Sequence, residues 1–251
     1  MRPDKKKKKV IPLYIYGKNA VDELLKTHPD AIKQAFVHNG SEEQYKKIFP
    51  KGMRLQPVHI STLDKHSNKG AHQGIVVELH NFPYLQFDFV LSRLRKNKTN
   101  TIVACDHITD PHNVGAIIRS AAAFGCDAII IEDVHQSPVN STVIKVSAGT
   151  AFHIPIARVA SLKGALATLQ KNRYVLYGLD MHGEDITDPH FTFAERSVFV
   201  LGSEGFGMRK EIAQMVDKTI AIPMKSGIES LNVSATAACV CYERQRQMRK
   251  S

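Results

Sequence analysis

The sequence predicts an α/β protein in which a parallel-sheet domain over residues 101–251 follows a small α/β unit over residues 1–80. From Thr101 onward, apolar strand patterns alternate with helical patterns, which is typical of parallel βαβ units. Several of these strands are apolar at every position, as expected where helices cover both faces of a sheet. The chain has 251 residues, of which 43% are hydrophobic, and this is enough to bury a substantial core.

The front unit carries its own helix and strand patterns. Helical spacing occurs over residues 19–26, and strand patterns occur at residues 35–38, 55–60 and 74–79. Ser41, followed by two glutamates, predicts an N-capped helix start, and Ser61 predicts another. Residues 81–100 contain Pro83 and a basic run and lose the strand pattern, which predicts a linker with a short helix.

The second unit is predicted to alternate strands with helices from Thr101 to its end. Strand patterns lie at residues 101–108, 128–131, 153–159, 174–179, 197–201 and 219–223. Helical patterns lie at residues 114–124, 142–147, 162–171, 208–215 and 233–249. Ligands in open parallel sheets bind beyond the carboxyl ends of the strands, so the loops after these strands are the first candidates for a site.

The charge balance favours a negatively charged partner, although many soluble proteins are equally basic. Lys and Arg number 34 against 24 Asp and Glu, for a formal net charge of +10. A basic surface of this size is compatible with binding to RNA. The unbroken run from Lys5 to Lys9 predicts either an RNA-binding arm or a solvated tail.

Composition also bounds the location of the protein. No stretch of about 18 apolar residues is present, so we expect no membrane span, and the charged N-terminus lacks the apolar segment of a secretory signal. The cysteines form no CxxC pair, which predicts free thiols rather than a zinc site or a disulfide framework. We therefore expect a cytoplasmic protein whose four cysteines are reduced: Cys105, Cys126, Cys239 and Cys241.

The loop after the first strand, residues 106–119, offers two candidate residues. Asn113 lies where a helix N-cap is expected, and Arg119 shares a helix face with small residues, including Gly115, so that a backbone or a ligand can approach its guanidinium. The alternative interpretation makes Asn113 an ordinary cap and Arg119 a partner in a surface ion pair.

Two further loops combine flexible backbone with polar residues. Residues 200–208 place Gly202 and Glu204 in a G-x-x-G-x-G segment, which matches neither the dinucleotide fingerprint nor the phosphate-binding P-loop. In residues 220–234 a strand stops at Pro223, and a long helix begins that Ser230 or Asn232 is expected to cap. An ordinary glycine-rich turn and a connection without chemistry remain the alternatives.

Taken together, the three loops resemble the signature motifs of the SpoU/TrmH RNA 2′-O-ribose methyltransferases of the SPOUT superfamily. The matching segments are residues 110–119, 201–207, 222–224 and 230–234, and residues 145–156 fit between the first two. The resemblance covers residues 101 to about 247. The front unit, through residues 16–21 and 72–74, resembles the ribosomal-protein-like substrate-binding domain of the RlmB-type members.

The resemblance implies a deep trefoil knot at the C-terminal end of the sheet, where the strand pattern alone predicts an ordinary Rossmann sheet. It implies that S-adenosylmethionine contacts Gly202, Ile222 and Leu231, largely through backbone groups, with Met224 nearby. It also implies a homodimer with the active site at its interface. The methyl sulfonium is already a strong electrophile, so we expect no metal.

The resemblance further assigns the catalytic residues. The arginine that matches Arg119 is proposed in the family as the general base, but a guanidinium stays protonated at neutral pH. We therefore expect Arg119 to hold an RNA phosphate or the developing alkoxide, while the proton passes to water or a phosphate oxygen. Asn113 would fix Arg119 or the ribose, and Glu204 would orient the site. Ser230 and Asn232 would position Arg119 and the cofactor.

Several alternatives remain open from the sequence. The RlmB-like front unit favours a guanosine of large-subunit ribosomal RNA as the target, and a tRNA substrate is the alternative within the family. A Rossmann-type methyltransferase would grip the cofactor ribose through Glu132 or Asp133, but residues 106–112, directly after the first strand, contain no glycine. A non-catalytic RNA-binding or ribosome-assembly protein would use the same basic surface.

Overall fold

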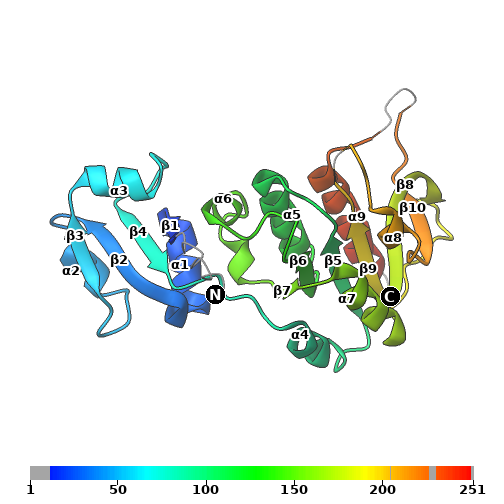
Figure 1. The fold of residues 1–251 in the computed structure, drawn as a ribbon, viewed down its shortest axis with the longest axis horizontal. Helices are drawn as coiled ribbons and strands as arrows, with labels where there is room; N and C mark the ends of the chain where they lie inside the picture. The colour runs from blue at the N-terminus through cyan, green and yellow to red at the C-terminus, as the bar shows by residue number, and fades with distance from the viewer. Residues whose placement is uncertain (1–11, 204, 226–229, 250–251) are drawn as a thin grey trace, which may run out of the picture. The chain divides into compact units, whose positions relative to one another are not determined.

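The computed structural model describes residues 12–203, 205–225 and 230–249. The chain forms two compact units, the first ending at Pro83 and the second running from Tyr84 (Figure 1). The segment expected to be a linker carries α4 (Phe87–Leu94), and its buried Val90, Leu91 and Leu94 belong to the core of the second unit. None of the helices within the described ranges is long and apolar enough to cross a membrane.

The first unit is a four-stranded sheet with helices packed against it. Strand β4 (Ile75–Leu79) is antiparallel to both β1 (Leu13–Tyr16) and β2 (Ile32–His38), and β2 is parallel to β3 (Leu55–Val58), giving the order β1-β4-β2-β3. Strand β1 is absent from the sequence-based prediction. The remaining elements are α1 (Lys18–Thr27), a 3₁₀ turn (Pro29–Ala31), α2 (Glu42–Lys46) and α3 (Ile60–His66).

The segment His72-Gln-Gly74, which carries part of the family resemblance, has a structural role in this unit. Helix α1 begins after Gly17, which has no side chain to cap it, and Gln73 Oε1 accepts a hydrogen bond from the Lys18 amide at 2.8 Å. The amide of Gly74 donates to His72 Nδ1 at 3.0 Å. These hydrogen bonds tie the turn before β4 to the start of α1.

A buried carboxylate supports the sheet of the first unit. Glu78 on β4 is 6% exposed and accepts hydrogen bonds from Lys33 and Gln34 on β2. Burial alone would raise the pKa of Glu78, but the hydrogen bonds from Lys33 and Gln34 outweigh it and hold the pKa below its ordinary value. The helix predicted to start at Ser41 does form as α2, although the serine side chain makes no capping hydrogen bond.

The second unit is a six-stranded, fully parallel sheet in the order β10-β8-β9-β5-β6-β7. Its strands are β5 (Asn100–Cys105), β6 (Ala128–Glu132), β7 (Ile156–Val159), β8 (Val175–Asp185), β9 (Arg196–Leu201) and β10 (Lys218–Ala221). Its helices after α4 are α5 (Pro111–Ala123), α6 (Ser141–Val146), α7 (Leu162–Lys171), α8 (Lys210–Ala213) and α9 (Val233–Met248), with a 3₁₀ turn at Thr150–Phe152. The predicted α/β class with a parallel sheet is confirmed.

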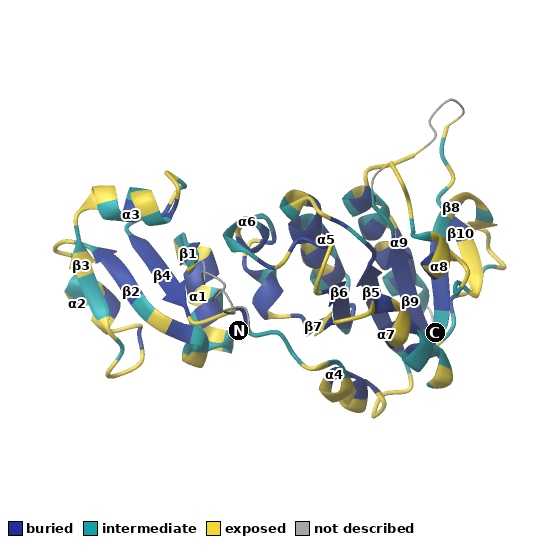
Figure 2. Cartoon of the chain, in the orientation of Figure 1, coloured by how far each residue is buried: buried dark blue, intermediate teal, exposed yellow. Residues whose placement is uncertain are grey.

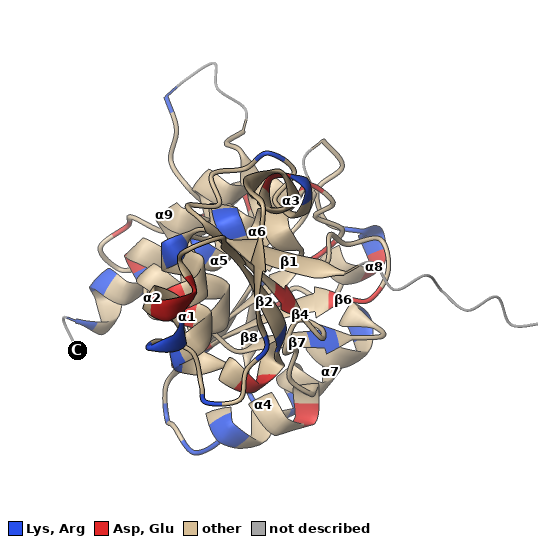
Figure 3. Ribbon diagram, turned by 90° about the vertical axis from the view of Figure 1, so that its left-hand side faces the viewer, with Lys and Arg blue, Asp and Glu red and all other residues tan. Residues whose placement is uncertain are grey.

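Helices on both faces explain why the central strands are apolar at every position. One face packs on α4 and α7, with Ile102 and Ala104 of β5 contributing. The alternate positions, such as Val103 and Cys105, are equally buried on the other face, where α5 and α9 pack against each other. Figure 2 shows buried strands between helices whose outer sides are exposed, and Figure 3 shows that charged residues lie mainly on helices and loops.

Two strands differ from their predicted ranges for identifiable reasons. Strand β7 begins at Ile156 rather than at residue 153, because the 3₁₀ turn Thr150–Phe152 ends only at its C-cap His153 and the pairing with β6 starts at Ile156. Strand β8 continues to Asp185 instead of ending at residue 179, and its pairing with β10 jumps from Gly178 opposite Thr219 to Glu184 opposite Ile220. Residues 179–183 therefore leave the ladder between two paired stretches, as in a bulge.

Candidate active site

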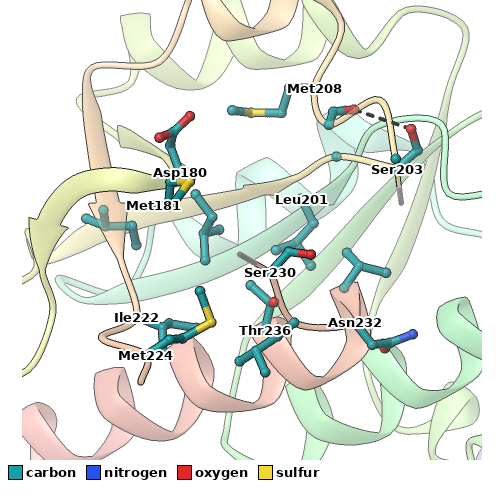
Figure 4. A pocket seen from close by; sticks show the side chains of 17 residues that line it. Asp180, Met181, Leu201, Ser203, Met208, Ile222, Met224, Ser230, Asn232 and Thr236 are labelled. Atoms are coloured by element: carbon teal, nitrogen blue, oxygen red, sulfur yellow. Dashed lines mark hydrogen bonds between the residues drawn. The ribbon is translucent and has the colours of Figure 1, made fainter. Parts of the chain in front are cut away.

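A cavity of about 530 Å³ opens at the carboxyl end of the sheet, where three segments distant in the sequence meet. The lining comes from residues 179–181 of β8, from residues within 201–203 and 205–208 at and after the end of β9, and from residues within 220–224 and 230–236 before and within α9 (Figure 4). The cavity lies where open parallel sheets place their ligands, beyond the ends of the strands. Its size falls within the range of about 300–1,000 Å³ that is typical of small-molecule sites.

The glycine-rich loop after β9 folds back on itself at the cavity. Ser203 and Gly207 exchange backbone hydrogen bonds of 3.0 and 2.9 Å, which closes the loop. A Cβ at Gly202 would lie 2.2 Å from the carbonyl carbon of Gly207, so no other residue fits there without displacing backbone. Gly207 has φ of +66°, a conformation that favours glycine. The glycines are required for the loop shape itself.

The end of this loop is fixed by a buried ion cluster. The Arg209 amide and Nε donate to the two oxygens of Asp106 at 2.7 and 2.6 Å, and its Nη2 donates to Glu132 at 2.8 Å. Asp106 at the end of β5 is fully buried, and Glu132 at the end of β6 is 6% exposed. Burial alone would lower the pKa of Arg209, but the hydrogen bond and charge of Asp106, with Glu132, raise it. The guanidinium therefore ties the loop to two neighbouring strands.

The same cluster removes support for the Rossmann-type alternative. One oxygen of Glu132 accepts the Arg209 hydrogen bond, and the other accepts the amide of Leu162 at 2.9 Å. The carboxylate that would hold a cofactor ribose in that alternative is thus engaged within the protein. Asp133, the other residue considered, forms an ion pair with Arg158 on β7.

Asn113 and Asn232 are brought together, although Asn113 is not the helix cap. The helix starts two residues before Asn113, because Pro111 occupies its first position. Asp110 is therefore the N-cap of α5, and its side chain accepts a hydrogen bond from the His112 amide at 2.8 Å. Asn113 lies one turn in, 7% exposed, and its Oδ1 accepts a hydrogen bond of 3.0 Å from Nδ2 of Asn232. Of the two predicted caps of α9, Ser230 and Asn232, it is Asn232 that caps the helix, by accepting a hydrogen bond from the Ser234 amide. The pair joins the first signature loop to the third.

Arg119 lies outside the cavity and on the exposed surface of α5. Six residues separate it from Asn113, which turns its side chain by about 240° around the helix axis. Within the described ranges, its guanidinium makes no hydrogen bond or ion pair. On the expected small-residue face, the backbone that approaches Gly115 belongs to α6: a Cβ there would lie 2.9 Å from the Val143 carbonyl oxygen and 2.7 Å from Val146 Cβ. The glycine accommodates a neighbouring helix of the same chain.

The structure places most of the candidate cofactor and catalytic residues in this one cavity. Its lining includes Gly202, Ile222, Met224 and Leu231, together with Ser230 and Asn232. Figure 4 shows Ile222, Met224, Ser230 and Asn232 around it. Glu204 and the lysine run at residues 5–9 lie outside the residues that the structure describes.

Residues of β8 complete the cavity and are missing from the sequence-based site. Asp180 and Met181 line it because the excursion of residues 179–183 carries them out of the β8–β10 ladder. Gly183 allows the chain to return, since a Cβ there would lie 2.5 Å from the Ile220 backbone. The position of Asp180, directly after the predicted strand 174–179, is a signal that would have identified it.

The fold and the cavity define a parallel-sheet α/β protein with a small-molecule site built from loops at the carboxyl edge. The SpoU rRNA Methylase family matches residues 100–242, and a family described as RNA 2'-O ribose methyltransferase substrate binding matches residues 14–85. The chain belongs to the SpoU rRNA methylase family. The 23S rRNA (guanosine-2'-O-)-methyltransferase RlmB of Acinetobacter baylyi is 31% identical over 242 residues, covering 94% of this chain and 98% of that protein. The Escherichia coli protein of the same name is 32% identical over 241 residues, covering 93% and 98%.

Solved structures show the same fold. The SpoU methyltransferase AviRb from Streptomyces viridochromogenes, in complex with AdoMet, aligns with a TM-score of 0.79 at 22% identity, over 96% of this chain and 92% of that chain. A structure described as a TrmH-family RNA methyltransferase from Porphyromonas gingivalis aligns with a TM-score of 0.75 at 23% identity, over 94% and 90%. At these identities the likeness establishes the fold.

Proposed function

We propose that this protein transfers a methyl group from S-adenosylmethionine to a ribose 2′-hydroxyl of RNA, at a guanosine of large-subunit ribosomal RNA. The observation that carries the proposal is the convergence of two signature loops on one cavity, with the third joined to them by the Asn113–Asn232 hydrogen bond. The curated relatives that span nearly the whole chain are guanosine-2'-O-methyltransferases of 23S rRNA by name. The ribosomal substrate also leads us to propose a cytoplasmic location.

The cavity fits the proposed cofactor in size and in chemistry. Leu201, Ile222 and Leu231 offer apolar surface for an adenine ring, and the tight loop at Gly202 presents backbone groups beside them. We propose that Gly202, Ile222, Leu231 and the nearby Met224 hold S-adenosylmethionine. When bound, the cofactor supplies an electrophilic methyl group on a sulfonium.

The protein residues have to align the ribose hydroxyl and to stabilise the oxygen as it loses its proton. Alignment of two reactants contributes up to about 7–11 kcal/mol. Asn113, Ser230 and Asn232 lie at the junction of the first and third loops, where they position the ribose and the cofactor. Arg119 binds the RNA phosphate or the developing alkoxide as a cation. Glu204 orients the site in this proposal.

The location of Arg119 supports a homodimer. The side chain is exposed and lies outside the cavity of its own chain. An active site that combines Arg119 with such a cavity would therefore draw on the surfaces of two copies. Phe124 at the end of α5 packs edge-on against Tyr242 of α9, and Tyr242 remains 54% exposed. We propose that two copies pair through α5 and α9 and that Arg119 acts at the interface.

Two further parts of the proposal concern the topology of the second unit and the role of the first unit. The chain runs from β9 through the glycine-rich loop to the edge strand β10 and then returns to α9, which packs beside α5. We propose that this return passes through a loop and forms a deep trefoil knot. The first unit, residues 12–83 as described, is proposed to be a ribosomal-protein-like RNA-binding domain, supported by the family match over residues 14–85.

Methyl transfer to RNA tests the function directly. The full-length protein, labelled S-adenosylmethionine and unmodified 23S rRNA are expected to give label on a guanosine ribose, located by mapping the modified nucleotide. Labelling of tRNA instead would redirect the substrate assignment while leaving the reaction intact. Failure to bind S-adenosylmethionine by calorimetry would contradict the enzyme proposal and favour a non-catalytic RNA-binding protein.

Variants of Arg119 test its assigned role. We expect Arg119→Ala to abolish methyl transfer while leaving the affinity for S-adenosylmethionine unchanged, because the residue lies outside the cavity. Arg119→Lys keeps the charge but loses the two-pronged guanidinium geometry, and we expect it to lose most of its turnover. Near-full turnover of Arg119→Lys would contradict the requirement for that geometry.

A further inference from the structure

The cavity proposed to hold the cofactor contains a single formally charged side chain among its 17 lining residues within the described ranges. That residue is Asp180, which is itself exposed, and the lining also includes the apolar Leu179, Met181, Met208 and Ile222. Figure 4 shows Asp180 near Met208, across the cavity from Met224. A carboxylate beside apolar surface exerts a stronger field on a bound ligand than one surrounded by water.

The path of the backbone brings the Asp180 carboxylate to the cavity wall. Residues 179–183 leave the β8–β10 ladder between two paired stretches, and Gly183 makes the return against Ile220 possible. Oδ1 of Asp180 accepts a hydrogen bond of 2.9 Å from the His182 amide, which fixes the side chain. The other carboxylate oxygen makes no hydrogen bond with the described residues, so it is available to a ligand.

We propose that Asp180 makes the cavity select the charged methyl donor over its demethylated product, an inference that rests on the proposed function. The donor and the product carry the same nucleoside and the same amino-acid part. They differ by one methyl group and by the positive charge of the sulfonium. A carboxylate therefore attracts the donor more strongly, whereas contacts with the shared parts stabilise both ligands equally. Release of the neutral product follows from the same difference.

The discriminating measurement is the ratio of two dissociation constants. S-adenosylmethionine and S-adenosylhomocysteine are titrated separately into the full-length wild-type protein and into Asp180→Asn. The asparagine keeps an oxygen for the His182 amide but removes the charge. We expect the preference for the donor to fall by about three- to tenfold in the variant, through weaker donor binding, with product affinity nearly unchanged.

Asp188→Asn is the matched control. Asp188 is exposed and accepts a backbone hydrogen bond from His190, two residues on, in the same way that Asp180 accepts from His182, but it lies outside the cavity lining. The control is expected to keep the wild-type ratio. Added salt gives a second readout on the wild-type protein alone, because screening weakens donor binding more than product binding.

The outcomes separate the inference from the function on which it rests. Equal losses of donor and product affinity in Asp180→Asn would show that the carboxylate binds a shared group such as a ribose hydroxyl, and would overturn the inference. An unchanged ratio in the variant, or equal salt dependence of both ligands, would overturn it as well. A wild-type protein that binds neither ligand would instead refute the proposed function.

Discussion

Replacement of Arg209 by methionine is the most informative test of how the cofactor loop is held. The side chain bonds to Asp106 and Glu132, which are 0% and 6% exposed. Methionine retains much of the apolar stem and removes every charged hydrogen bond. The two buried carboxylates would then lose the guanidinium that they share, and breaking a buried pair in this way costs about 3–5 kcal/mol.

We expect the loss in the free energy of unfolding to lie near the lower end of that range. The Arg209 side chain is 26% exposed, so water reaches part of the cluster and screens it. The amide of Arg209 also continues to donate to Asp106 in the variant. We therefore expect about 3 kcal/mol from urea unfolding followed by circular dichroism. Affinity for S-adenosylmethionine is expected to fall as well, because the freed loop carries Gly202.

Lys98→Met is the matched control, since it removes the cation of an exposed ion pair with Glu195. Pairs of this kind contribute little, so its urea midpoint is expected to match that of the wild type. Arg209→Met combined with Asp106→Asn is expected to recover part of the loss, because one buried charge is gone. A variant of Arg209 that unfolds at the same urea concentration as Lys98→Met would refute the reasoning.

Three further predictions follow from single sites. Gly202→Ala is expected to abolish S-adenosylmethionine binding in calorimetry, because its Cβ would lie 2.2 Å from the Gly207 backbone. Gly164→Ala in helix α7 is the control: the nearest side-chain atom to its new Cβ is 3.7 Å away, and the variant should gain about 0.5–1 kcal/mol in the free energy of unfolding. Thiol labelling of the native protein should modify Cys239 first, because it is exposed. Cys105 should react slowly, because burial raises the pKa of its thiol to about 12. Fast labelling of Cys105, detected by mass spectrometry, would contradict this. The stability advantage of the wild type over Glu78→Gln should be complete at neutral pH and shrink as pH falls through the lowered pKa of Glu78; a constant difference in urea unfolding down to about pH 2 would be inconsistent with it.

The parallel sheet could be predicted because its signal is local and strong. Uninterrupted apolar runs, such as the one ending at Cys105, indicate strands that are buried on both faces, and each lies close to its observed position. Strand β1 was missed because it is four residues long and follows the basic run, so neither length nor alternation marks it. Its sheet position depends on pairing with β4, about sixty residues away, which no local pattern reveals.

The site could be predicted only in part, because its parts are related by tertiary contacts. The three loops were selected from their glycines and polar residues, the roles of single residues came from the family resemblance, and Asn232 was one of two predicted helix caps. The hydrogen bond between Asn113 and Asn232 joins residues 119 positions apart and required the structure. Asp180 directly follows a predicted strand, which marks it as a candidate, but its place in the cavity depends on a register shift between β8 and β10 that only the structure shows.

The distribution of charge around the cavity suggests how one site accommodates two ligands of opposite charge. Asp106 and Glu132 both bond to the guanidinium of Arg209 beneath the loop, so these charged groups hold the loop and are absent from the described cavity lining. The described lining then presents only the carboxylate of Asp180 to a ligand, which favours a cation and repels a phosphate. A positive charge suited to the RNA backbone lies outside, on Arg119. We therefore expect the nucleic acid to enter at the edge of the proposed α5–α9 dimer interface, where Arg119 lies, and to meet the donor where Ser230 and Asn232 line the cavity.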